Sequence, residues 1–123
     1  MHYLRWEQPT TLRAWEDAGM SYDSTLGYAD RPGFRCGTCH EYPAFDPVAQ
    51  VQLNLRIRPL VVMKCTIIAD RYMGLGYTEE SLTRFLYIKE NCRKVNDSFA
   101  LLWHNSHFKN KNDFEVYVKV LIV

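Results

Sequence analysis

Apolar and polar residues alternate most regularly between residues 51 and 57, where the sequence reads V-Q-L-N-L-R-I. A period of two places all four apolar side chains on one face of an extended chain, so this segment is predicted to be a half-buried strand. Three other apolar runs have the length and composition of strands. They are residues 20–26, 60–68 and 98–103.

Helical periodicity is clearest near the start of the chain. Leu12, Trp15 and Ala18 recur at intervals of three residues and would share one face of a helix. Pro9 suits the first helical position, and Gly19 stands where a left-handed residue commonly ends a helix. A helix is therefore predicted between these two residues.

A second helix is predicted to begin after Thr78, whose hydroxyl can cap the first turn. Residues 79–80 are acidic and residues 93–94 are basic, which suits the helix dipole at both ends. The inner face of this helix is expected to carry Leu82, Phe85, Leu86, Lys89 and Cys92.

The remaining segments are less regular. Residues 27–47 hold three Gly and three Pro and are expected to form a long loop, and residues 70–74 a short turn of helix. Residues 113–123 are rich in β-branched side chains, yet their apolar spacing favours a helix. The order of strands and helices predicts an α/β fold.

Composition narrows the classes of protein. With 123 residues, of which 47% are apolar, the chain suits one small domain. A net charge of +1 gives no electrostatic reason to expect nucleic acid as a partner. Lys64 interrupts the longest apolar run, so no membrane span is expected. The first residues do not resemble a signal peptide, which favours a cytoplasmic location and reduced thiols.

The sequence C-G-T-C-H at residues 36–40 is the most conspicuous short motif. Its spacing matches c-type haem attachment, with Cys36 and Cys39 as the thiols and His40 as the iron ligand. It also matches a redox dithiol. A zinc site would need two more ligands, and Cys65 and Cys92 lack the paired spacing of such sites. The simplest interpretation of Cys65 and Cys92 is that they are small buried apolar residues.

Five segments in this order resemble the C-terminal part of a subfamily of polysaccharide deacetylases (carbohydrate esterase family 4, the NodB homology domain). The resemblance covers about residues 2–108. Its motifs are HYLRW at 2–6, PTTL at 9–12, DSTLGYAD at 23–30, GFRCGTC at 33–39 and LWHN at 102–105. On this interpretation the haem-like spacing is accidental, because Cys39 belongs to the GFRCGTC loop.

The resemblance implies an irregular (β/α) barrel that removes acyl groups from glycans with a zinc-like divalent metal. His104 matches the family's histidine at the end of a late strand, which acts as general acid. An imidazole can protonate a leaving amine near neutral pH. The alternative is that His104 is a structural histidine at the end of an apolar strand.

Other residues are expected to bind the glycan in the family's complete domain. Arg35 would hold a carboxylate, Asp30 would line the same cleft, and Tyr28 and Trp103 would lie against the sugar. His2 would be a further substrate-binding residue. The other four each have a simpler interpretation, as loop packing, a loop ion pair or a buried strand residue. For His2 the simpler expectation is disorder at the start of the chain. Flat aromatic rings, at 14% of the chain, suit either role.

The chain also departs from the family, because it has no Asp-Asp pair near its start and no His-x-x-x-His. We therefore expect a single partial domain over residues 1–123, the C-terminal portion of a barrel. No metal or cofactor is expected in this chain, which would be inactive alone and would self-associate through unpaired strand edges. The alternative functions are a non-catalytic carbohydrate-binding or interaction module, and a haem or dithiol redox protein through Cys36, Cys39 and His40.

Overall fold

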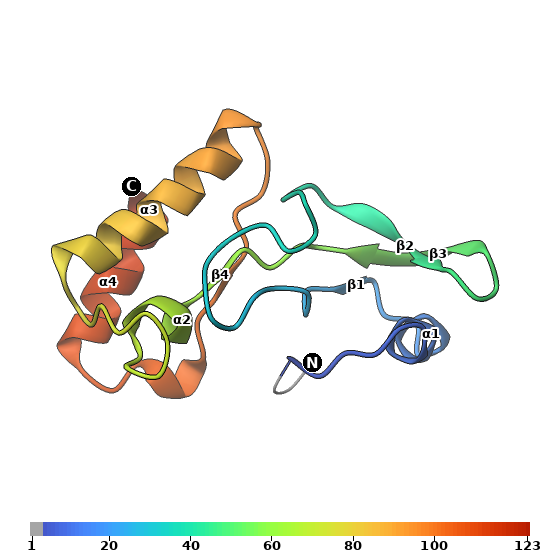
Figure 1. Cartoon of the computed structure of the whole chain (residues 1–123), viewed down its shortest axis with the longest axis horizontal. Helices are drawn as coiled ribbons and strands as arrows, with labels where there is room; N and C mark the ends of the chain where they lie inside the picture. Colours follow the sequence, from blue (N-terminus) through green and yellow to red (C-terminus); the bar gives the residue numbers. More distant parts are fainter. Residues whose placement is uncertain (1–3) are drawn as a thin grey trace.

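The computed structural model describes residues 4–123, which form an elongated mixture of helices and strands. The chain is arranged as two groups of elements (Figure 1). Helix α1 and three strands make one group, and three further α-helices with two short strands make the other. A long loop, residues 27–41, runs between the groups.

The first group is a three-stranded sheet with a helix on it. Strand β3 is central and pairs in parallel with β1 and antiparallel with β2. The elements are α1 (Thr10–Asp17), β1 (Tyr22–Asp23), β2 (Tyr42–Asp46) and β3 (Val51–Ile57).

Helix α1 is attached to this sheet by side chains as well as by apolar packing. The carboxylate of Glu16 accepts hydrogen bonds from the backbone N–H groups of Asn54 (3.0 Å) and Leu55 (2.7 Å). Arg13 donates to Asp46 at the end of β2, with 2.5 Å between Nε and Oδ2. Helix α1 therefore contributes to the fold through both polar and apolar contacts.

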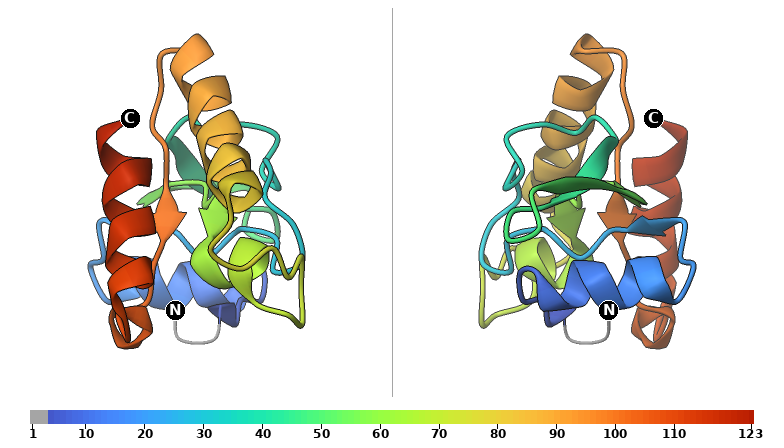
Figure 2. Two further views of the ribbon diagram at one scale, coloured as in Figure 1. Left: turned by 90° about the vertical axis from the view of Figure 1, so that its left-hand side faces the viewer. Right: turned by 90° about the vertical axis from the view of Figure 1, so that its right-hand side faces the viewer.

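The second group contains a βαβ unit. Strands β4 and β5 lie side by side in parallel, and the chain between them forms α2 and α3. Figure 2 shows α3 and α4 side by side. The elements are β4 (Val62–Met63), α2 (Lys64–Ile68), α3 (Glu79–Lys94), β5 (Leu101–Leu102), the short 3-10 helix η2 (Asn105–His107) and α4 (Lys111–Ile122).

Each group has its own apolar core. The smaller core lies between α1 and the sheet and is built from Leu12, Ala44, Leu55 and Ile57. The larger core lies among β4, α2, α3 and α4. Its fully buried members include Ile67, Phe85 and Val120, each with no exposed surface.

The long loop is fastened to the second group by backbone hydrogen bonds. The partners on the other side are Leu60 and Val61, which lead into β4. The N–H of Leu60 donates to the carbonyl of Leu26, just before the loop (3.2 Å), and the N–H of Gly33 in the loop donates to the carbonyl of Val61 (2.9 Å). Gly27 needs its missing side chain, because a Cβ there would lie 2.9 Å from the Leu60 carbonyl oxygen. The loop is therefore an ordered part of the fold.

Several predicted elements are confirmed. The strand at 51–57 has the predicted bounds, α1 begins one residue after Pro9, and Gly19 has the expected left-handed φ of +70°. The Thr78 hydroxyl accepts from the Ser81 N–H and caps α3. The C-terminal segment is the helix α4 that its spacing favoured.

The predicted inner face of α3 is correct in part. Phe85 and Cys92 are buried, together with Ser81 and Ile88. Lys89 is half-buried, and its amine donates to the carbonyls of Val120 (2.6 Å) and Leu121 at the end of α4. The lysine thus satisfies helix-end carbonyls instead of packing in the core.

Other predictions were wrong. The run 60–68 is a strand only at Val62–Met63 and then becomes α2, because a run that is buried on all sides has no periodicity to separate strand from helix. The strands predicted at 20–26 and 98–103 shorten to two residues each. Residues 70–74 form a turn without helix.

The predicted loop at 27–47 was also wrong in part, because it ends in strand β2. Pro43 lies in this strand, and a proline is unfavourable in most strands, so the sequence favoured a loop there. The strand is at the edge of the sheet, where a residue without an N–H group is tolerated. Register irregularity between Pro43 and Phe45 further obscured the alternation.

The fold class is mixed helix and strand, and the paired strands form two separate sheets in the part of the chain described. A closed barrel is not formed by residues 4–123. Within these residues, no helix is both long and apolar enough to cross a membrane.

Asp46 makes the first group sensitive to acid. Hydrogen bonds from Arg13 and from the backbone N–H groups of Val48 and Ala49 lower the pKa of Asp46 to about 2. A lowered pKa stabilises the folded state above the unfolded value near 4, and this contribution is lost as pH falls toward 2. Asp46→Asn should therefore reduce the loss of stability between pH 5 and pH 2.

The measurement is urea denaturation at several pH values, with Asp70→Asn at an exposed position as the control. The control should keep the acid sensitivity of the unaltered chain. The same pH dependence in the Asp46→Asn variant as in the unaltered chain would contradict the assignment.

Candidate functional site

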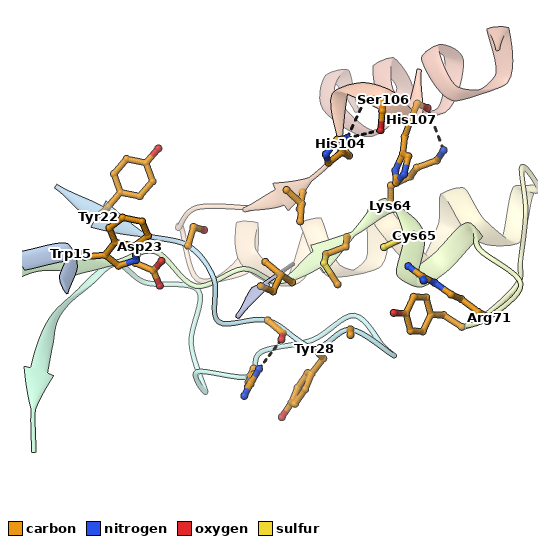
Figure 3. Close-up of a pocket in the computed structure, with 18 of the residues that line it drawn as sticks. Trp15, Tyr22, Asp23, Tyr28, Lys64, Cys65, Arg71, His104, Ser106 and His107 are labelled. Atoms are coloured by element: carbon orange, nitrogen blue, oxygen red, sulfur yellow. Dashed lines mark hydrogen bonds between the residues drawn. The ribbon is translucent and has the colours of Figure 1, made fainter. Parts of the chain in front are cut away.

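A wide, open depression of about 1460 Å³ lies between the two groups of elements. Its wall combines residues from the start of β1, the long loop, α2 and the segment after β5. Figure 3 shows His104, Ser106 and His107 along one side of the depression, with Tyr28 and Arg71 on the opposite side. Lys64 lies beneath His107.

His104 is placed at the rim by strand β5, which ends two residues before it. Its Nδ1 accepts a hydrogen bond from the Ser106 N–H (3.1 Å) and lies 2.6 Å from the Ser106 hydroxyl. Because Nδ1 is an acceptor, Nε2 carries the hydrogen of the neutral ring. The imidazole is exposed and oriented by the start of η2.

His107 lies beside it, with 5.4 Å between the ring centroids. Burial lowers the pKa of His107, and the positive charge of Lys64 lowers it further. His107 is therefore held toward its neutral form, so the two imidazoles do not face each other as two cations.

Lys64 begins α2 and takes part in a buried ion pair. Its Nζ lies 2.5 Å from Oδ1 of Asp113, and their side chains are 11% and 1% exposed. Tyr77 also donates a hydrogen bond to this carboxylate. Burial alone would raise the pKa of Asp113, but the bonds from Lys64 and Tyr77 outweigh it and lower the pKa to about 2.

The same aspartate also begins helix α4. Its Oδ2 accepts from the N–H groups of Lys109 (3.0 Å) and Asn110 (3.2 Å), and the Asn110 side chain accepts from the Asp113 N–H. This reciprocal capping box closes the first turn of the helix. The depression is thereby linked to α4 through Lys64.

Three of the residues predicted from the sequence line the depression together: His104, Tyr28 and Arg35. Arg35 donates from its guanidinium to the carbonyl of Gly27 (3.1 Å), next to Tyr28. Asp30 is exposed and lies 3.8 Å from Arg31, so it pairs with Arg31 and not with Arg35.

Trp103 is half-buried and packs into the second core, outside the lining of the depression. Its ring centroid lies 5.2 Å from that of Tyr117 on α4 and 6.2 Å from that of Phe85 on α3. This position fits the interpretation of a buried strand residue. His2 lies outside the described residues.

The sequence interpretation missed four residues of the depression with charged or imidazole side chains: Lys64, Arg71, His107 and the buried Asp23. Lys64 carried one signal, a single charge inside an otherwise apolar run, and Asp23 begins the motif DSTLGYAD. The others are ordinary surface residue types in sequence, and only the chain fold brings them to one wall.

The cysteine motif is divided between the two cores. Cys36 packs against the first core, while Cys39 is buried in the second core with Cys92. His40 is exposed and its ring pairs with Asp97. The two thiols are not presented together to one cofactor, which disfavours the haem and dithiol interpretations.

Burial raises the pKa of Cys92 to about 12, and its contact with Cys39 contributes. The thiol is thus an inert apolar group in the core, as predicted for this cysteine.

No cluster of three or more His, Cys, Asp or Glu side chains suited to a metal ion occurs among residues 4–123. These residues do not fit a metal centre by themselves.

Comparisons with known proteins returned no match: no protein-family model matches the chain, and no curated protein or solved structure is significantly similar to it. The function is therefore argued from the motifs and from the geometry of the depression.

Proposed function

We propose that this chain is the C-terminal part of a polysaccharide deacetylase-like domain, with His104 as the general acid. The observation that carries the proposal is that His104, Tyr28 and Arg35, which come from three separate motifs of the resemblance, line one depression. The metal ligands and the catalytic base would come from outside residues 4–123.

The strand arrangement supports this proposal. Strands β4 and β5 are parallel neighbours joined through helices, which is the repeating unit of a (β/α) barrel. Hydrogen bonds from Leu60 to Leu26 and from Val61 to Ala100 connect three neighbouring chain segments at this point. In the proposed complete domain, these segments would form part of an irregular barrel, with His104 at a strand end.

The chemistry assigned to this chain is proton donation and substrate positioning. When an acyl group leaves a sugar nitrogen, the amine must gain a proton. The Nε2 of His104 is the ring nitrogen left available for this, because Nδ1 is held by Ser106. Tyr28 offers a ring face for an apolar sugar face across the depression.

The test is acetate release from acetylated sugar oligomers. Residues 1–123 alone are expected to release none, because they contain no candidate metal cluster in their described part. A composite protein, in which a family N-terminal half supplies Asp-Asp and His-x-x-x-His, is expected to be active. His104→Asn in the composite should lower kcat about 100-fold, the usual contribution of general acid catalysis.

His40→Asn is the matched control, because His40 is also exposed but lies outside the depression. It should leave kcat unchanged. Acetate release by the unaltered 123-residue chain, or full activity of the His104→Asn composite, would contradict the proposal.

A second function is a non-catalytic carbohydrate-binding module. It is favoured by the aromatic wall of the depression, to which Trp15, Tyr22, Tyr28 and Tyr72 contribute. Such a module would bind glycans without turnover even in the composite protein.

Separate sheets with open edges also support self-association of the chain through strand pairing.

A further inference from the structure

We propose that the depression binds an acidic glycan, whose sugar carboxylates contact Arg35 and Arg71 in its lining. This inference deepens the proposed function and rests on it, because it names the class of sugar that the same site takes. It is carried by the distribution of charge along the wall of the depression.

The two arginines are the uncompensated cations of this wall. Within residues 4–123, neither guanidinium forms an ion pair with a carboxylate. Arg35 donates one N–H to the Gly27 carbonyl. Arg71 stacks on Tyr72, with its Cζ 4.8 Å from the ring centroid. A guanidinium has five N–H donors, so most of these remain available to a ligand.

The segments that carry the two arginines are tied together. The Thr66 hydroxyl of α2 donates to the carbonyl of Ala29 in the long loop, at 2.7 Å. Arg71 lies three residues after the end of α2, and Arg35 belongs to that loop. Figure 3 shows Arg71 on the same side of the depression as Tyr28, and Arg35 belongs to the loop that contains Tyr28.

The other charged groups leave this side positive. Lys64 is neutralised by Asp113, and His107 is held toward its neutral form. Asp23 is the carboxylate of the wall, but it accepts from the N–H and hydroxyl of Thr25 (3.3 and 2.6 Å). Figure 3 shows Asp23 beside Trp15 and Tyr22, at the end away from Arg71.

This arrangement suits a sugar acid better than a neutral sugar. A planar carboxylate accepts paired N–H bonds from a guanidinium, and such charge-assisted bonds are about twice as strong as neutral ones. Tyr28 and Tyr72 line the same depression, with Arg31 over one ring and Arg71 over the other. Aromatic side chains of this kind offer apolar surface to pyranose faces. A uronic acid residue presents both groups at once.

Binding to the 123-residue chain can be measured directly by calorimetry, without any turnover. The probe is trigalacturonate, and its fully methyl-esterified form is the matched neutral ligand. The acid is expected to bind at least about tenfold more tightly than the ester. Arg71→Gln and Arg35→Gln should each weaken its binding about tenfold, which corresponds to one charge-assisted hydrogen bond.

Arg84→Gln on the outer face of α3 is the control and should leave the affinity unchanged, since Arg84 pairs with Glu80 on the same helix. Thermal unfolding of each variant verifies that the exposed substitutions leave the fold intact. Equal affinity for acid and ester, or no detectable binding of the acid, overturns the inference. Because the assay contains no turnover step, this failure is distinct from the absence of acetate release.

Discussion

Replacing Asp113 with alanine should lower the free energy of unfolding by about 3–5 kcal/mol, the usual cost of leaving a buried charge without its partner. The substitution leaves the ammonium of Lys64, whose side chain is 11% exposed, without its carboxylate partner. It also removes the capping box at the start of α4. Urea denaturation at neutral pH measures the effect.

Two variants separate the buried charge from other effects. Glu115→Ala breaks the exposed ion pair with Lys111, whose atoms lie 3.3 Å apart, and should cost about 0.5 kcal/mol or less. The double substitution Lys64→Met with Asp113→Leu should be more stable than Asp113→Ala alone, because no charge is left buried. If Asp113→Ala costs no more than Glu115→Ala, the pair does not have the role assigned to it.

Phe85→Ala is the second substitution with a large expected effect, again about 3–5 kcal/mol. The ring of Phe85 is completely buried on α3 and lies in the core with Cys92 and Val120. Its removal leaves a cavity on the side of α3 that faces α4 and Trp103. Since the same ring lies 6.2 Å from that of Trp103, the loss should also loosen the segment that carries His104.

Tyr87→Ala is the matched control on the same helix, because this aromatic side chain is 62% exposed. Its removal should change stability by about 0.5 kcal/mol or less. Equal midpoints of denaturation for the two variants would show that α3 does not pack through Phe85. A change confined to Phe85→Ala confirms which face of the helix is inward.

The elements predicted correctly are those with local signals. The strand at 51–57 has one face on the core, and its alternation is visible in the sequence. Helix α3 has its own cap at Thr78 and opposite charges at its two ends. These signals act between residues a few positions apart, so they are readable before folding.

The elements missed are those that depend on their surroundings. Helix α2 is buried on nearly all sides, so its sequence has no polar face to mark it as helical. Strand β2 contains Pro43, which is compatible with a strand only because β2 lies at a sheet edge. Burial and edge position are properties of the assembled chain, which no short window of sequence contains.

The candidate site shows the same division. Motifs alone indicated His104, Tyr28 and Arg35, and the structure places all three on one depression. The other cationic residues of the wall, Arg71 and Lys64, carried no motif. Only the folded chain brings them to the depression.

Local sequence alone accounts for the helix caps, the alternating strand and the identity of the imidazole proposed as acid, because propensity, capping and residue chemistry act over a few positions. Tertiary structure alone brings Lys64 to Asp113, 49 residues away, and places Arg35 and Arg71 on one wall. Such pairings depend on how far-separated segments pack, and the burial that gives them their strength exists only in the folded chain.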